Sequence, residues 1–242
     1  MSGTQCPPNA NALHSPILAG YLIRAAEASN DDSLKSFALG YSTHVVSDEV
    51  GFATGGGYLG NLSGIIDWST EWPFMLAVDA YILQEDLYPD NTFPSTPVTD
   101  KNMEFLASVV QQYASINPRS PSFNVTQLSA CSTTWSPAVN QMNGLASLQD
   151  PATTAKLLVF FDRFGATTIE AAAANLLANW GCVQKTLTVF VDALLNDSTT
   201  TPEQAWATTA AYIAQSFEQG LCTVQAKPAS NHAHKPRRIL KL

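Results

Sequence analysis

The chain has 242 residues, which is enough for one sizeable hydrophobic core and for at most two domains. Apolar residues make up 45% of the chain and charged residues only 13%, a balance that favours a compact fold and excludes a disordered chain. Acidic residues outnumber basic ones by 20 to 12, and five of the basic residues fall within 227–242. The body of the chain is therefore acidic, which suits cation binding and is a poor match for a nucleic-acid groove.

The first two helices are predicted by apolar residues that recur at helical spacing. The first has Pro16 in its first turn, so His14 lies at its N-terminus. Asp32 or Ser33 is expected to cap a second helix, which runs over about 34–50.

The same periodicity predicts helices along the rest of the chain, over about 67–87, 100–115, 137–148, 151–164, 167–180, 183–195 and 202–219. Asp100 is expected to cap one of them, Gly181 to end another, and 117–135 to form a loop. Strand patterns are nearly absent, so the predicted fold class is all-α, with eight or nine helices. We expect a single domain over 1–226 and a basic, disordered tail over 227–242.

His44 and Asp48 stand four residues apart on the second predicted helix, so their side chains lie on one helix face. This is a spacing at which one helix can offer two ligands to a metal ion. Phe37 and Tyr41 share the face, and a buried carboxylate is costly unless it is paired or coordinated. The alternative is a hydrogen-bonded pair with a purely structural role. Asp67 and Glu71 repeat the spacing, and their alternative is an N-cap followed by an ordinary first-turn acid.

Four cysteines and three Asn-x-Ser/Thr sequons favour an oxidising, secreted setting with two disulfides, at Cys6, Cys131, Cys182 and Cys222. Three pairings are possible, and the sequence does not choose between them. The sequons begin at Asn61, Asn124 and Asn196. Residues 1–13 show no signal-peptide pattern, so secretion implies a true N-terminus upstream of this chain. There is no run of 18 apolar residues, and we therefore predict no transmembrane segment.

Three segments within 11–88 read LHSPILAGYLIRAAE, FALGYSTHVVSDEVGF and DWSTEWPFML. They resemble the zinc-dependent phospholipase C/D family, and most closely the N-terminal catalytic domain of glycosylphosphatidylinositol-specific phospholipases D. The most specific element is Leu-Gly-x-x-x-His-x-x-x-Asp, which here ends in His44 and Asp48. The resemblance implies an all-α fold related to zinc phospholipases C and single-strand nucleases. It also implies phosphodiester cleavage of a phospholipid or glycosylphosphatidylinositol at a membrane surface.

The family resemblance also implies a ligand set for one to three zinc ions, made of His14, His44, Asp48, Asp67 and Glu71. Asp48 and Glu71 would be the catalytic carboxylates, and Asp48 would be able to bridge two ions. The chain departs from the family pattern at Phe52 and Ser63, where histidines are expected.

Three functions follow from these observations. The leading one is a metal-dependent phosphodiester hydrolase, and no GxSxG or HExxH motif supports a serine hydrolase or a zincin instead. The second is a catalytically degenerate domain of the same fold that acts as a binding module, which Phe52 and Ser63 motivate. The third and weaker one is a single-strand nuclease, against which the acidic body counts.

Overall fold

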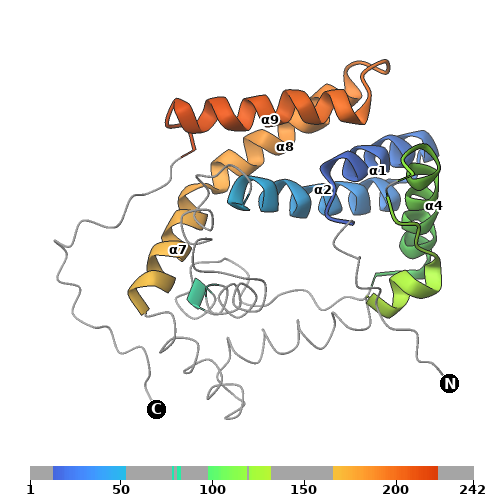
Figure 1. Ribbon diagram of the computed structural model, residues 1–242, viewed down its shortest axis with the longest axis horizontal. Coiled ribbons are helices and arrows are strands. Elements are labelled where there is room, and N and C mark those ends of the chain that lie inside the picture. The colour runs from blue at the N-terminus through green and yellow to red at the C-terminus, as the bar shows by residue number, and fades with distance from the viewer. Residues whose placement is uncertain are drawn as a thin grey trace, which may run out of the picture.

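The computed structural model describes residues 13–52, 78, 81–82, 98–118, 120–131 and 166–222, and this part of the chain contains helices and no strand. The fold class is therefore all-α, as predicted. The helices are α1 (Pro16–Ser29), α2 (Asp32–Phe52), α4 (Asp100–Ile116), α7 (Ala166–Ala178), α8 (Trp180–Leu195) and α9 (Pro202–Glu218). Figure 1 shows α1 and α2 side by side, α4 next to them, and α9 lying across α8.

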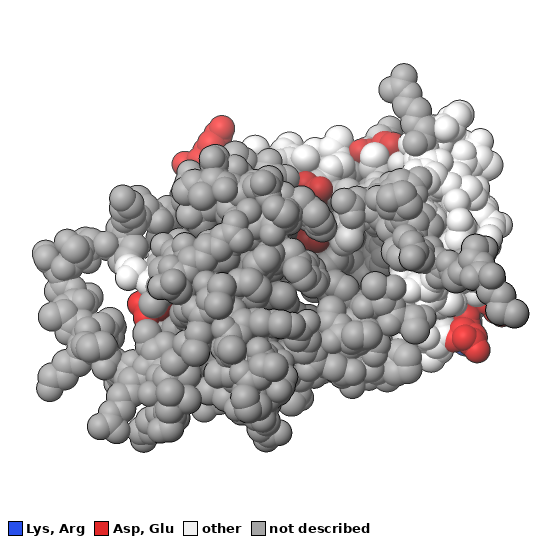
Figure 2. Space-filling model, turned by 60° about the horizontal axis from the view of Figure 1, so that its bottom comes forward, with Lys and Arg blue, Asp and Glu red and all other residues white. Residues whose placement is uncertain are grey.

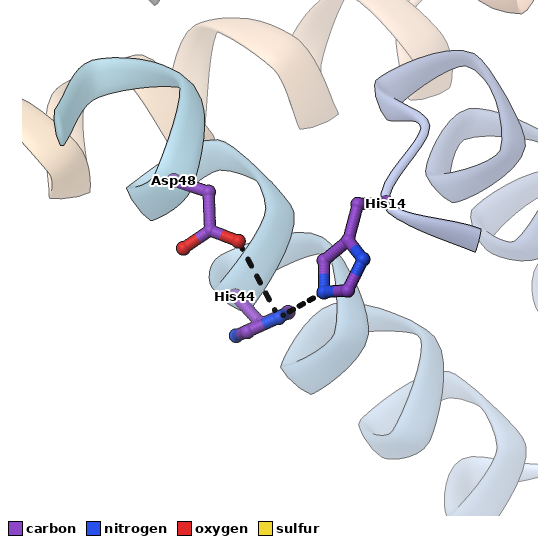
Figure 3. Close-up of side chains that lie close together, drawn as sticks. All are labelled: His14, His44 and Asp48. Atoms are coloured by element: carbon purple, nitrogen blue, oxygen red, sulfur yellow. Dashed lines mark hydrogen bonds and ion pairs between the residues drawn. The ribbon is translucent and has the colours of Figure 1, made fainter. Parts of the chain in front are cut away.

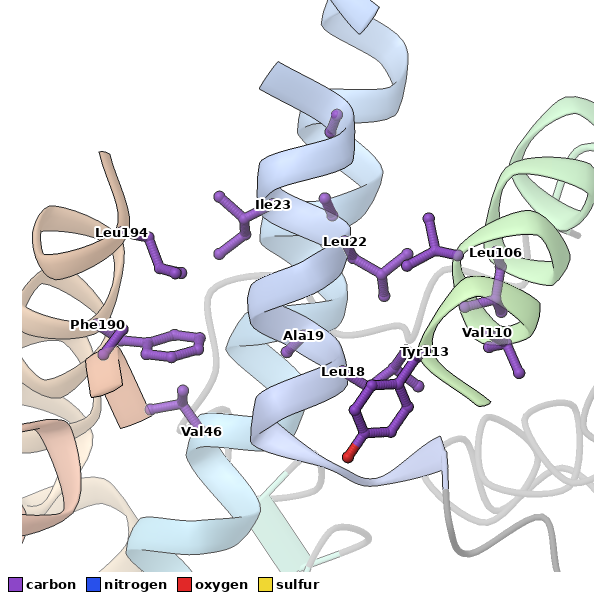
Figure 4. Packing of buried hydrophobic residues seen from close by; sticks show 14 of the residues in the cluster. Leu18, Ala19, Leu22, Ile23, Val46, Leu106, Val110, Tyr113, Phe190 and Leu194 are labelled. Atoms are coloured by element: carbon purple, nitrogen blue, oxygen red, sulfur yellow. The ribbon is translucent and has the colours of Figure 1, made fainter. Parts of the chain in front are cut away.

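Helix α1 is the centre of the described core, because it contacts α2, α4, α8 and α9. Figure 4 shows α1 between two groups of apolar side chains, with Phe190 of α8 on one side and Leu106 of α4 on the other. Leu18 and Leu22 of α1 are almost completely buried. A helix that is covered on several sides needs apolar residues around most of its circumference, which explains the apolar character of PILAGYLIRAAEAS.

Glycine at position 20 allows α9 to approach α1 closely. A Cβ atom built at Gly20 would lie 2.8 Å from the Cβ of Pro202, the first residue of α9. That separation is shorter than real Cβ contacts allow, so a side chain at this position would push the two helices apart.

Two predicted helix caps were displaced by one residue or more. Asp31, rather than Asp32 or Ser33, caps α2, since its Oδ1 accepts hydrogen bonds from the backbone N–H groups of Ser33 at 3.0 Å and Leu34 at 3.3 Å. A cap must lie just outside the helix for its side chain to reach the free N–H groups of the first turn.

The same geometry moves the cap of α4. Thr99, rather than Asp100, is the N-cap, and its side chain accepts from the N–H of Asn102. Asp100 is instead the first helical residue, where its negative charge interacts favourably with the N-terminal end of the helix dipole. For α9, the predicted opening is confirmed, because Thr201 and Gln204 form a capping box. The helix ends at Glu218, close to the predicted 219, and Gly220 follows it with a positive φ of 70°.

Two further predictions were wrong. Residues 125–131, expected in a loop, are helical. Asn124 and Gln127 cap this turn reciprocally, the Asn124 Oδ1 accepting from the Gln127 N–H at 2.9 Å. The break between α7 and α8 falls at Asn179, so Gly181 lies in the first turn of α8 and does not end a helix.

One disulfide joins Cys182 to Cys222, with the two Cα atoms 5.5 Å apart, and Cys131 is disulfide-bonded as well. The sequon residues Asn124 and Asn196 are exposed. Both findings are compatible with an extracellular protein. In the described part of the chain, no helix is both long and apolar enough to cross a membrane.

The other expectations concern residues outside the described ranges. These are the helices predicted over 137–148 and 151–164 and the tail over 227–242. Of the helix predicted over 67–87, only Val78, Tyr81 and Ile82 are described, and all three are helical.

Candidate metal centre

His14 is placed by the start of α1. Ser15 is the N-cap of this helix, and its side chain accepts a hydrogen bond from the N–H of Leu18. His14 therefore stands immediately before the helix, as the sequence predicted. In Figure 3 its ring extends from the segment before α1 towards the surface of α2.

His44 and Asp48 occupy consecutive turns of α2, and this part of the prediction is confirmed by the helix bounds. The Nε2 atom of His44 lies 3.5 Å from Oδ2 of Asp48 and 3.1 Å from Nε2 of His14. Figure 3 shows the three side chains converging, with His44 between the other two. One potential ligand atom from each residue lies within 4.8 Å of the others.

The chemistry and spacing of this group fit a small divalent cation. Two imidazole nitrogens and a carboxylate oxygen form a donor set that zinc accepts, with bonds of about 2.0–2.2 Å. Tetrahedral coordination at those bond lengths separates neighbouring ligand atoms by about 3.3 Å. The separations of 3.1 Å and 3.5 Å around His44 are already close to this value.

The two histidines contact each other through like atoms, which constrains their protonation. Nε2 of one ring must carry the proton and donate, while Nε2 of the other must accept. When both rings are neutral and each carries its proton on Nδ1, a cation between them would be able to take the Nε2 lone pairs of both rings in place of this hydrogen bond. The contact thus brings two metal-ligating atoms together before any ion is bound.

The centre lies at the surface, which corrects the expectation of a polar pair within an apolar interior. The side chain of His44 is 56% exposed and that of Asp48 is 32% exposed. The apolar side of α2 is formed by neighbours such as Val45 and Val46, which are buried. Helical periodicity located the face that carries the pair but not the degree to which other segments cover it.

The pKa of His44 is lowered by desolvation, because part of the imidazole lies against protein rather than water. A lowered pKa favours the neutral ring, which is the form that binds metal. Next to the centre, burial raises the pKa of Glu49, and the negative charge of Asp48 raises it further. A cation beside Asp48 would offset that repulsion.

The remaining predicted site residues, Asp67 and Glu71, lie outside the described residues, as does Ser63. For Phe52 only the helical backbone is described. The structure therefore brings together His14, His44 and Asp48 from the predicted set.

Tyr41 has a role that the sequence analysis missed. It was assigned to the apolar stripe of α2, but its hydroxyl donates a hydrogen bond to the backbone carbonyl of Leu13, next to His14. The available signal was its position three residues before His44, which places it on the same face. The partner carbonyl lies 28 residues away, and no local pattern indicates it.

Comparisons of the chain with protein-family models, with curated proteins and with solved structures gave no match.

Proposed function

We propose that this chain is a metal-dependent phosphodiester hydrolase of the zinc-dependent phospholipase C/D type. Its substrate would be the headgroup phosphodiester of a phospholipid or a glycosylphosphatidylinositol. The observation that carries the proposal is the convergence of His14, His44 and Asp48 within 4.8 Å of one another at the protein surface. The all-helical fold agrees with the family that the sequence resembles, and the disulfide is compatible with an extracellular setting.

Each of the three residues has a distinct part in such a centre. The imidazoles of His14 and His44 supply neutral nitrogen ligands, and the carboxylate of Asp48 balances part of the metal's charge. When bound, zinc lowers the pKa of a coordinated water and stabilises negative charge on a phosphoryl group. Because His44 is more than half exposed, a headgroup phosphate at a membrane surface would be able to approach from solvent. Asp67 and Glu71 remain predicted members of the same site.

The acidic composition of the chain, with 20 acidic and 12 basic residues, argues against the nuclease alternative. On the face shown in Figure 2, the charged side chains visible among the described residues are acidic. A nuclease groove needs Lys and Arg to neutralise successive phosphates. A single lipid headgroup makes no such demand, because one metal centre neutralises one phosphodiester.

A catalytically degenerate binding module is the second candidate. Phe52 and Ser63 stand where the family pattern expects histidines, so ligands needed for a complete three-zinc site are missing from the sequence. This candidate predicts that the folded protein holds no tightly bound metal, and that His44→Leu is tolerated or stabilising.

Zinc content and hydrolysis by the full-length chain separate these candidates. We expect stoichiometric zinc by elemental analysis and release of phosphorylated headgroup or phosphatidic acid from phosphatidylinositol vesicles. His44→Ala and Asp48→Ala should each lose both metal and activity while remaining folded by circular dichroism. Asp192→Ala is the matched control, since it removes an exposed carboxylate from a different helix, α8.

Two outcomes would contradict the hydrolase. One is metal-free protein that cleaves the vesicles as fast as zinc-loaded protein. The other is calorimetry that shows no zinc binding to the wild-type chain, which would leave the binding module. Cleavage of single-stranded DNA but not of vesicles would instead support the nuclease.

A further inference from the structure

We propose that Tyr41 is a positioning residue that holds His14 at the metal centre through its hydrogen bond to the Leu13 carbonyl. This inference rests on the proposed function, because it assigns a role at the same centre. Tyr41 would not contact the metal or the substrate. It would fix the backbone from which the His14 imidazole reaches His44.

The hydrogen bond joins the two elements that make the centre. Tyr41 lies on α2 one turn before His44, while Leu13 directly precedes His14 in the segment that leads into α1. Its hydroxyl therefore links the backbone beside one ligand to the helix face that carries the other two. On the other side of His14, Ser15 is fixed as the N-cap of α1.

The position of His14 explains why a hydrogen bond that fixes its backbone is needed. This residue precedes α1 and is exposed, whereas His44 and Asp48 are built into a helix. A metal-ligating residue outside a helix loses more conformational entropy on binding a metal than one inside a helix. This loss lowers the affinity for the metal unless the residue is already fixed when the protein folds. A hydrogen bond to the adjacent carbonyl restricts the backbone without occupying the imidazole.

The ring and the hydroxyl of Tyr41 have separable roles. The ring packs at the edge of the core beside Phe37, with the ring centroids 6.4 Å apart. Burial raises the pKa of Tyr41 well above its ordinary value, so the hydroxyl stays protonated and continues to donate at any pH at which the histidines bind metal. Tyr41→Phe keeps the packing and removes only the donor.

A thermodynamic cycle tests the inference with zinc as the probe. Zinc affinity is measured by competition with a chromophoric chelator for the wild type, Tyr41→Phe, His14→Ala and the double variant. Loss of a residue that orients a ligand typically weakens metal binding by about 10–100-fold, and we expect Tyr41→Phe to fall in this range. In the His14→Ala background the same substitution should have no further effect, because the ligand that it positions is gone.

Tyr21→Phe is the matched control. It also removes a tyrosine hydroxyl from a partly buried side chain, but one that donates to Oε1 of Glu203 at 3.1 Å and not to the backbone beside a ligand. We expect wild-type zinc affinity from this variant. Cobalt substitution adds a second readout, because the visible spectrum of bound Co²⁺ should change in Tyr41→Phe and stay unchanged in Tyr21→Phe.

The possible failures are distinguishable. If the wild-type chain binds no zinc, the metal centre itself is wrong and the role of Tyr41 is overturned with it. If the wild type binds zinc, His14→Ala weakens binding and Tyr41→Phe does not, the centre stands and the Tyr41 inference is overturned. The inference would also be overturned if Tyr41→Phe weakened zinc binding equally in the wild type and in His14→Ala. The same holds if Tyr21→Phe weakened zinc binding as much as Tyr41→Phe does.

Discussion

Two pairs of consecutive helices, α1–α2 and α8–α9, are each held together at the end away from their connection, but by different interactions. In each pair a short connection joins one end, and residues distant in sequence come together at the other. In α8–α9 these are Cys182 and Cys222, 40 residues apart and covalently bonded. In α1–α2 they are His14 and His44, 30 residues apart, with their Nε2 atoms 3.1 Å from each other. The first link is a covalent bond, while the second is a hydrogen bond at the protein surface.

The connections at the closed ends also differ. Asn30 adopts a left-handed conformation with φ of 53° between α1 and α2, and Asp31 caps the helix that follows. Between α8 and α9, Arg24 of α1 donates to the backbone carbonyls of Asp197 at 2.7 Å and Thr200 at 2.8 Å. Helix α1 thus stabilises the connection of the other pair, so the two pairs form one packed unit.

Removing the disulfide is expected to have the largest effect on the stability of the protein. Cys182→Ala with Cys222→Ala should lower the free energy of unfolding by about 4 kcal/mol, because a cross-link that spans 40 residues restricts the unfolded chain. Urea denaturation measures the change. Hydrogen exchange should show the greatest loss of protection in α9, and equal loss in α1 and α2 would show that this link stabilises both helix pairs alike.

Zinc is also expected to stabilise the chain, at α1–α2, but by binding the folded state and not by restricting the unfolded chain. A ligand that binds only the folded state stabilises it by about 2.7 kcal/mol at a concentration 100 times its dissociation constant. Differential scanning calorimetry should therefore show a higher Tm for the wild-type chain with zinc, and a chelator should reverse the shift. His14→Ala should reduce it, and an unchanged shift in that variant would show that zinc binds elsewhere.

The comparison also shows what the sequence was able to predict. The helices around His14, His44 and Asp48 followed from apolar periodicity, because that pattern is local and the helix caps lie nearby. The hydrogen bond from Tyr41 to the Leu13 carbonyl and the surface exposure of His44 did not, since both depend on how distant segments pack. The disulfide pairing had three solutions for the same reason, and the structure selects the one that joins Cys182 to Cys222.

A smaller effect is expected where the two pairs meet. Gly20→Ala places a methyl group 2.8 Å from the Pro202 Cβ, and the resulting overpacking, which typically costs about 1–3 kcal/mol, should exceed the gain in helix propensity of up to about 1 kcal/mol. Gly40→Ala on α2 is the control, because its Cβ would meet nothing within 4 Å. Chemical denaturation should show destabilisation of the first variant by about 1 kcal/mol and slight stabilisation of the second. Equal effects would show that α1 and α9 are not closely packed at Gly20.

The smallest expected effect concerns the cap of α2. A hydrogen bond from Lys101 of α4 lowers the pKa of Asp31 below its ordinary value of 3.8, and backbone N–H groups of the first turn of α2 add to the shift. Because the folded state holds the carboxylate in its charged form, the stabilisation is present above pH 3.8 and is lost as the pH falls through the lowered pKa. Titration of the Asp31 carboxyl carbon by NMR should show this lowered pKa, and Lys101→Met should raise it. A pKa that is unaffected by this substitution would mean that the cap alone holds Asp31 in its charged form, and that α4 contributes nothing to the start of the helix that carries the candidate metal centre.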